Sequence, residues 1–169
     1  DIDYAASSWK VMDAKEIERI VKTHCRPPLA VGEFMHENGR VPVWFDMEGG
    51  RVRLWENLIP TADGGFMVPV ENKYTAGFDI SMGKGGEESS QSVASVWSLT
   101  TNTKVAQFNV RDMNPADFAE YGVAICRFFN NAYMCYEVNG PGNIFGKRVI
   151  TDLHYTNVFH RTSENKIGR

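Results

Sequence analysis

The sequence predicts a mixed α/β domain built on five strands in the spatial order 3-2-1-4-5, with helices on its flanks. Two observations predict this architecture. Three strand-like runs follow one another with short polar turns between residues 74 and 111, which is typical of an antiparallel meander. Two helix-like runs then alternate with two further strand-like runs, and because such crossovers are right-handed, the fourth strand returns beside the first and parallel to it.

Composition limits the class of protein. With 169 residues, 43% of them hydrophobic and 12% aromatic, the chain is long enough and apolar enough for a folded core. The formal net charge of −3 provides no extended basic face, so any contact with nucleic acid has to come from local patches. The three cysteines, Cys25, Cys126 and Cys135, form no metal-binding pair and indicate reduced, structural thiols in the cytoplasm. No apolar stretch approaches the ~18 residues of a membrane span, so no membrane partner is expected.

Residues 1–72 are predicted to form a small appendage with one helix and several short strands. Asp13 is the expected N-cap of the helix, and Glu16 stands three residues later in a capping-box pattern. After "RPPL", short strand-like runs broken by Gly and Pro extend to about residue 70. The main domain is therefore assigned to residues 73–169.

Each element of the main domain has its own signal in the sequence. Strands are expected at residues 74–81, 92–99 and 104–111, and a helix capped by Asn114 follows, with Pro115 in its first position. "AYMCYEVN" is the expected fourth strand, "GPGNIFGKRVITDLHY" the second helix and "NVFHRTS" the fifth strand.

Two carboxylates end neighbouring strands of this topology. Asp79 ends the first strand and Glu137 ends the fourth, so both reach one edge of the sheet at its topological switch point. We expect Asp79 at a buried strand end, where an unpaired carboxylate costs several kcal/mol and a metal ion would neutralise it. Mg²⁺ is held by one or two carboxylates with water and phosphate oxygens, and two such ions ~3.5–4 Å apart promote phosphodiester hydrolysis. Taken singly, each acid is more often a turn residue or a surface residue, and only their adjacency favours a site.

Five further residues are candidate DNA contacts. Gly140 and Gly142 in "VNGPG" allow phosphate to approach a helix start, although an ordinary strand-to-helix turn uses the same residues. Lys147 and Arg148 either contact a nucleic-acid backbone or lie on a solvated helix face. "GKGGEESS" lacks the GxxxxGK[ST] pattern of a P-loop and is predicted to be a hairpin tip, with Lys84 against the substrate.

A resemblance to a known family covers most of the chain and rests on two stretches. They are "YTAGFDISMGKGGEESSQSVASVWSLTTNTKVAQFNV" and "NPADFAEYGVAICRFFNNAYMCYEVNGPGNIFGKRVITDLHYTNVFHR". Together they resemble the nuclease domain of phage terminase large subunits, most specifically in the pairing of "GFD" with "YEVNGPG" across one crossover. The resemblance implies an RNase H-like fold and an endonuclease that cuts concatemeric double-stranded DNA with two Mg²⁺ or Mn²⁺ ions. Asp79 and Glu137 are the catalytic and metal-binding residues that it implies.

The resemblance also implies partners and a location. They are an upstream ATPase domain in the same polypeptide, with residues 1–72 at the junction, a portal protein and a small terminase subunit, all in the cytoplasm of a bacterial host. The family's third acid lies on or near a later helix, so we expect the C-terminal part of the fold to be missing here. Asp152 is not expected to replace that acid. Some family members carry a further aspartate after the glycine loop, and this chain has Ser or Gln at that position, with Glu87 and Glu88 nearby. The isolated chain is therefore expected to be a monomer and a weak or inactive nuclease.

Two other functions are open at this point. A sugar-kinase or actin-like ATPase also begins with a strand, an aspartate and a glycine- and serine-rich turn, but it needs a second copy of the fold. A non-catalytic module that lines the DNA path or docks on the procapsid would use the same acids structurally.

Overall fold

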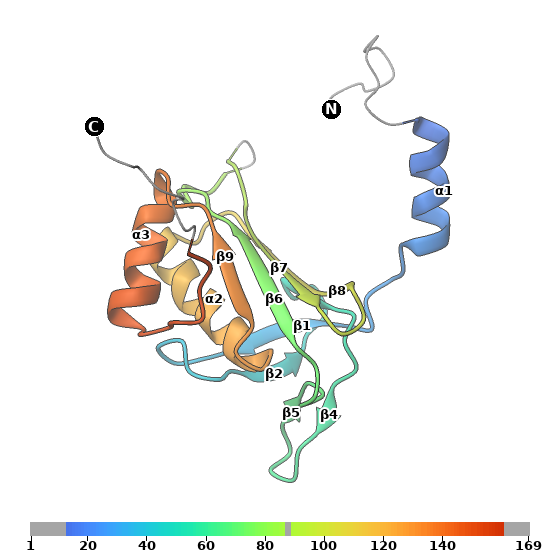
Figure 1. Cartoon of the computed structure of the whole chain (residues 1–169), viewed down its shortest axis with the longest axis horizontal. Helices are drawn as coiled ribbons and strands as arrows, with labels where there is room; N and C mark the ends of the chain where they lie inside the picture. Colours follow the sequence, from blue (N-terminus) through green and yellow to red (C-terminus); the bar gives the residue numbers. More distant parts are fainter. Residues whose placement is uncertain (1–12, 87–88, 161–169) are drawn as a thin grey trace, which may run out of the picture.

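The computed structural model describes residues 13–86 and 89–160 (Figure 1). The elements, in order, are α1 (Ala14–His24), β1 (Ala30–Met35), β2 (Val43–Asp46), β3 (Val52–Leu54), β4 (Ile59–Pro60), β5 (Phe66–Met67), β6 (Tyr74–Asp79), β7 (Ser92–Ser98), β8 (Thr103–Val110), α2 (Pro115–Phe128), β9 (Tyr133–Tyr136), α3 (Pro141–Lys147) and the π-helical turn η1 (Arg148–Asp152). Among these described helices, none combines the length and the apolar character that a membrane span requires.

Most strands belong to one sheet in the order β2-β1-β3-β8-β7-β6-β9 (Figure 1). β6, β7 and β8 form the predicted antiparallel meander, and β9 returns parallel to β6. The mixed α/β class and the predicted order 3-2-1-4 are therefore confirmed. The predicted fifth strand is reduced to one parallel bridge between Val158 and Met134, and its last residues, 161–163, lie outside the described residues.

The prediction of five strands is wrong in number because the N-terminal strands extend the same sheet. β3 pairs antiparallel with β8, with Val52 opposite Phe108, and β1 and β2 follow beyond it. Pairing with β3 satisfies the backbone groups that an edge strand at β8 would leave unpaired. Phe34 and Trp44 from these strands also join the main hydrophobic core. The boundary between residues 72 and 73 stays a prediction.

An aromatic cluster joins α2 and α3 to one face of the sheet. The ring of Phe118 on α2 is fully buried, with its centroid 5.9 Å from Phe78, 6.1 Å from Phe108 and 5.6 Å from Phe145. Each such side chain contributes about 1.5–3 kcal/mol on burial. Gly122 lets α2 lie close to β6, since a Cβ there would meet Phe78 Cε1 at 2.7 Å. The helices thus fix the orientation of β6 and β9.

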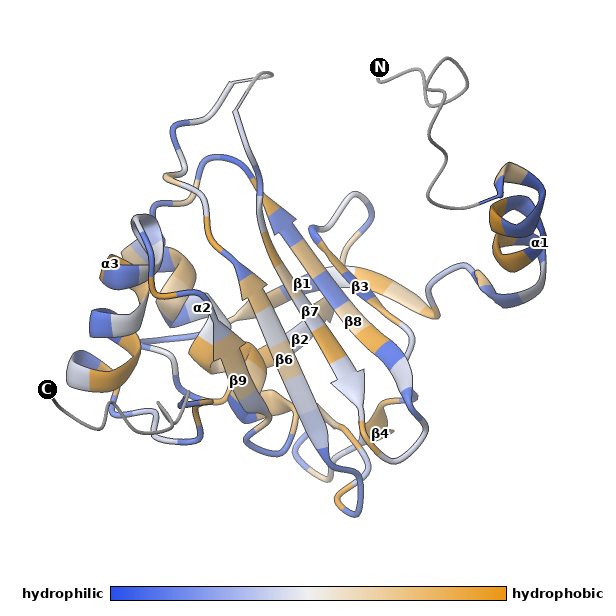
Figure 2. Ribbon diagram, turned by 45° about the horizontal axis from the view of Figure 1, so that its top comes forward, coloured by the Kyte–Doolittle hydropathy of each residue, from blue (hydrophilic) through white to orange (hydrophobic). Residues whose placement is uncertain are grey.

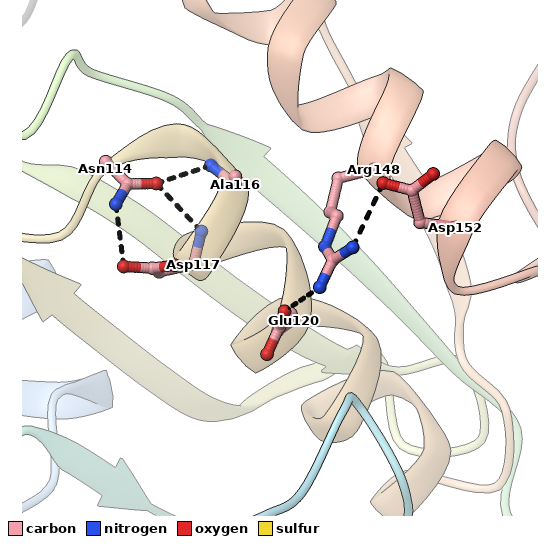
Figure 3. A network of polar contacts seen from close by, with 6 residues as sticks. All are labelled: Asn114, Ala116, Asp117, Glu120, Arg148 and Asp152. Carbon is pink, nitrogen blue, oxygen red and sulfur yellow. Dashed lines mark hydrogen bonds and ion pairs between the residues drawn. The ribbon is translucent and has the colours of Figure 1, made fainter.

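The two predicted N-caps are both present. Asn114 Oδ1 accepts hydrogen bonds from the amides of Ala116 at 2.9 Å and Asp117 at 3.0 Å, and so it fixes the start of α2 (Figure 3). Asp13 accepts from the Lys15 amide at 2.9 Å at the start of α1. Glu16 pairs with Arg19 at 2.6 Å and does not reach back to the cap residue, so the predicted capping box is not formed.

Candidate functional site

The candidate site lies where β6 and β9 end side by side. The parallel register places Phe78 opposite Tyr136, so that Asp79 and Glu137 take the next positions on strands that run ~4.8 Å apart. Both acids line one cavity of about 310 Å³, together with Phe78, Ile80, Asn139 and Gly142. The structure therefore brings the two acids together at one edge of the sheet. Their role as metal ligands stays a prediction.

The expected burial of Asp79 is wrong. Tyr74, Ala76 and Phe78 of β6 are buried against the helices, and Asp79, one residue further, is exposed on the opposite face. Glu137 is exposed as well. Because two unit charges ~4 Å apart in water repel by only about 1 kcal/mol, the pair is tolerated without a neutralising partner and is open to a solvated cation. Burial therefore gives no reason for a metal here, whereas the convergence of two acids does.

A second cavity, of about 410 Å³, adjoins Asp79 on the side of the β6–β7 hairpin. Its lining includes Ser81, Lys84, Ser90 and Gln91. Lys84 is exposed and is thus placed in the same cavity as Asp79. Glu87 and Glu88 lie outside the described residues.

Two serines that the sequence analysis missed hold the base of this hairpin. Ser92 is fully buried, and its Oγ accepts a hydrogen bond from the Ser81 amide at 3.0 Å. Ser81 Oγ in turn accepts from the Gly83 amide at 3.3 Å. Gly83 has a φ of +64° and lies so close to Met113 that a Cβ would come 2.0 Å from its carbonyl oxygen. The sequence signal that could have identified this contact is the polar Ser92 at an inward-facing position of β7.

The glycines of "VNGPG" shape the turn that carries Glu137. Gly140 has a φ of +45°, which favours glycine. A Cβ on Gly142 would lie 1.8 Å from the carbonyl oxygen of Glu137, and the Gly142 amide already donates to Asn139 O at 2.8 Å. The turn itself therefore requires both glycines. Phosphate contact at Gly140 or Gly142 stays a prediction.

Arg148 takes part in ion pairs within the protein (Figure 3). Its guanidinium donates to Glu120 on α2 and to Asp152 at 3.1 Å, and these two hydrogen bonds raise its pKa. Arg148 thus connects α2 to η1, and its DNA contact stays a prediction, as does that of the exposed Lys147. Asp152 is paired with Arg148, and the expectation that it does not replace the third acid stays a prediction. Within residues 13–86 and 89–160, no group of three or more His, Cys, Asp or Glu side chains could hold a metal ion.

Comparison with known proteins identifies the fold. No family model matches the sequence, and no curated protein matches it. Among solved structures, the chain is similar to the large terminase nuclease from thermophilic phage G20c with bound cobalt, at 14% identity and a TM-score of 0.51, covering 82% of this chain and 57% of that one. The chain has the large terminase nuclease fold. The same phage nuclease with bound magnesium is similar at 16% identity and a TM-score of 0.49, covering 82% and 58% of the two chains.

The terminase nuclease fold agrees with the RNase H-like strand order found above. The chain spans less than two thirds of the solved nuclease chains, 57% of the cobalt-bound one. The large terminase nuclease resemblance noted in the sequence is thereby confirmed at the level of the fold.

Proposed function

We propose that this chain is the nuclease part of a viral DNA-packaging terminase and takes part in metal-dependent hydrolysis of concatemeric double-stranded DNA. One observation carries the proposal: Asp79 ends β6, Glu137 directly follows the adjacent parallel strand β9, and both line one cavity in a large terminase nuclease fold. The sugar-kinase and docking-module hypotheses have no comparable support.

The acids suit a hard divalent cation. Both are exposed, both provide only oxygen ligands, and Mg²⁺ or Mn²⁺ needs no more than one or two carboxylates when water and phosphate oxygens complete its shell. The similar phage nuclease was solved with bound cobalt, another divalent ion. When bound, such ions lower the pKa of water and stabilise charge on a phosphodiester. Two carboxylates suffice for one ion, and we propose that a second ion binds beside it for phosphodiester hydrolysis.

The chain's own residues then have distinct tasks. Asp79 and Glu137 hold the cation, and the tight turn at Gly142 fixes the backbone of Glu137. The hairpin base at Ser81 and Ser92 fixes the wall of the second cavity, from which Lys84 contacts phosphate. By the same proposal, the partners are double-stranded DNA, an upstream ATPase domain of the same polypeptide, a portal protein and a small terminase subunit in the cytoplasm of a bacterial host.

Plasmid nicking by the full-length protein tests the proposal. Wild type, Asp79→Asn and Glu137→Gln are compared in Mg²⁺ and in Mn²⁺, with Asp152→Asn as the matched control because Asp152 is an acid bound to Arg148 outside the site. We expect a fall of about 100-fold or more in both site variants, the scale of losing a group that stabilises a transition state, and little change in the control. Full activity in both site variants rejects the assignment.

The 169-residue chain alone is a second test. We expect it to nick plasmid weakly or not at all, because the described residues offer no group of three or more His, Cys, Asp or Glu side chains for a metal. Robust cutting by a protein verified to contain only these 169 residues would show that they supply a complete metal site.

A further inference from the structure

The face of the sheet opposite α2 carries charged side chains at its two ends and a mixture of uncharged polar and apolar side chains between them. No helix among residues 13–86 and 89–160 covers this face, which Figure 2 shows from the front with hydrophilic positions along β8. On β9, β6, β7, β8 and β3 the outward positions form three rows. They are Glu137, Asp79, Val93 and Asn109; Cys135, Gly77, Ser95, Gln107 and Arg53; and Tyr133, Thr75, Trp97 and Lys104.

Charge is divided between the two ends of this open face. The acids Asp79 and Glu137 stand at one end, and the bases Arg53 and Lys104 stand at the other, with uncharged polar and apolar residues between them. A cation bound by the acids would make the first end attractive to phosphate, and the second end is attractive already. The face therefore complements one extended polyanion better than it complements a single small anion.

The basic end is held in place by contacts along β8. Lys104 Nζ donates to Gln107 Oε1 at 2.6 Å and lies 4.9 Å from the centroid of the Trp55 ring. Gln107 Nε2 donates to Asn109 Oδ1 at 2.9 Å. An ammonium group has three N–H donors, so the contact with Gln107 leaves Lys104 able to bind phosphate as well. Ordering of this kind reduces the entropy lost when a ligand binds.

The middle row of the face has no side chain at Gly77. Gly77 has no positive φ, and nothing lies within 4 Å of a Cβ built on it, so neither backbone conformation nor packing requires glycine there. A glycine within a strand otherwise weakens the strand and often marks the close approach of a ligand. A broad partner can therefore lie across the rows without meeting side chains at Gly77.

The distance between the two ends gives the length of DNA involved. Asp79 and Lys104 differ by four positions along a strand, about 14 Å, and by two strand spacings, about 10 Å, or about 17 Å on the diagonal. Arg53 is about 16 Å from Asp79 by the same calculation. At 3.4 Å of rise for each base pair, both distances equal about five base pairs.

We propose that this open face binds the phosphate backbone of duplex DNA on one side of the cut, with Lys104 and Arg53 contacting phosphates about five base pairs from the scissile one. This inference rests on the proposed nuclease function and adds where the substrate lies. A protein segment that covers the same face is the competing outcome of the test.

Salt-dependent binding of a 24-base-pair duplex tests the inference. Fluorescence anisotropy is measured in Ca²⁺ over a series of salt concentrations for the wild-type chain and for Lys104→Ala combined with Arg53→Ala. The matched control combines Lys15→Ala with Arg40→Ala, which removes two exposed cations elsewhere. Two lost phosphate contacts should flatten the slope of log K against log salt by about 1.8, with about 10-fold weaker binding or more. The control should keep the wild-type slope, and a Lys104→Arg variant should largely keep it as well.

Equal slopes in the double variant and the control would overturn the inference and leave the face to a protein partner. Plasmid nicking by the full-length protein separates the two proposals. If nicking depends on Asp79 and the slopes are equal, the nuclease function stands and the DNA path is wrong. If the slopes differ as expected and no nicking occurs, the DNA-binding face stands and the nuclease function is wrong.

Discussion

Gly142→Ala is the substitution with the most definite consequence for the site. The new Cβ would lie 1.8 Å from the Glu137 carbonyl oxygen, and contacts of this kind are essentially never shorter than 3.0 Å, so the two atoms must separate by at least 3.0 − 1.8 = 1.2 Å. Asn139 O, bound to the Gly142 amide at 2.8 Å, restrains the other side of the turn. Glu137 is therefore displaced by about 1 Å. A misplacement of about 1 Å costs on the order of 100-fold in rate.

The assay is the rate of plasmid nicking by the full-length protein with Mn²⁺, together with urea unfolding of each variant. The matched control is Gly49→Ala in the turn between β2 and β3, whose Cβ meets nothing within 4 Å but whose φ of +74° imposes about 1–2 kcal/mol of backbone strain. We expect Gly142→Ala to lose about 100-fold in rate and the control to lose stability with less than a tenth of that effect on rate. A folded Gly142→Ala protein that nicks at the wild-type rate would refute the claim that the position of Glu137 matters.

Three further predictions concern stability and pH. Arg148→Met should lower the urea midpoint, because it removes the ion pairs with Glu120 and Asp152, and it should leave the affinity for duplex DNA unchanged. Weaker DNA binding with an unchanged urea midpoint would instead indicate that Arg148 contacts DNA. Asn114→Ala should cost about 1 kcal/mol of unfolding free energy, because two amides at the start of α2 lose their acceptor, and Asn114→Asp should restore most of it. Burial raises the pKa of Glu33, but hydrogen bonds from Arg51 outweigh it and hold the pKa below its ordinary 4.5. The ionised Glu33 carboxylate therefore stabilises the fold above about pH 4.5, and this contribution is lost as the pH falls. The urea midpoint should thus fall less between pH 7 and pH 4 in Glu33→Gln than in wild type. An equal fall in the two proteins would contradict the assignment.

The pairing of Asp79 with Glu137 could be predicted because it depends on local patterns and one chirality rule. Alternation defines β6, the Asn114 cap and Pro115 define the start of α2, and a right-handed crossover then places β9 beside β6. Each of these signals lies within a few residues of the element that it specifies. Side chains alternate between the two faces of β6, so Asp79 faces the side opposite to the buried Phe78. The expectation that Asp79 is buried was therefore an error of interpretation.

The pairing of β3 with β8 could not be predicted in the same way. Val52 and Phe108 are far apart in the sequence, and nothing in a three-residue strand specifies its partner among several exposed edges. One of the two bases of the open face depends on this pairing, because it places Arg53 beside Gln107. The π-helical turn at Arg148–Asp152 is also set by tertiary contacts, since Arg148 connects it to Glu120 on α2.

A crystal of the chain soaked in Mn²⁺ tests the central claim most directly, through the anomalous density near the ends of β6 and β9. The account predicts a peak bound by carboxylate oxygens of both Asp79 and Glu137, at about 2.0–2.6 Å from each. Well-ordered carboxylates that share no ion at saturating Mn²⁺ would contradict it.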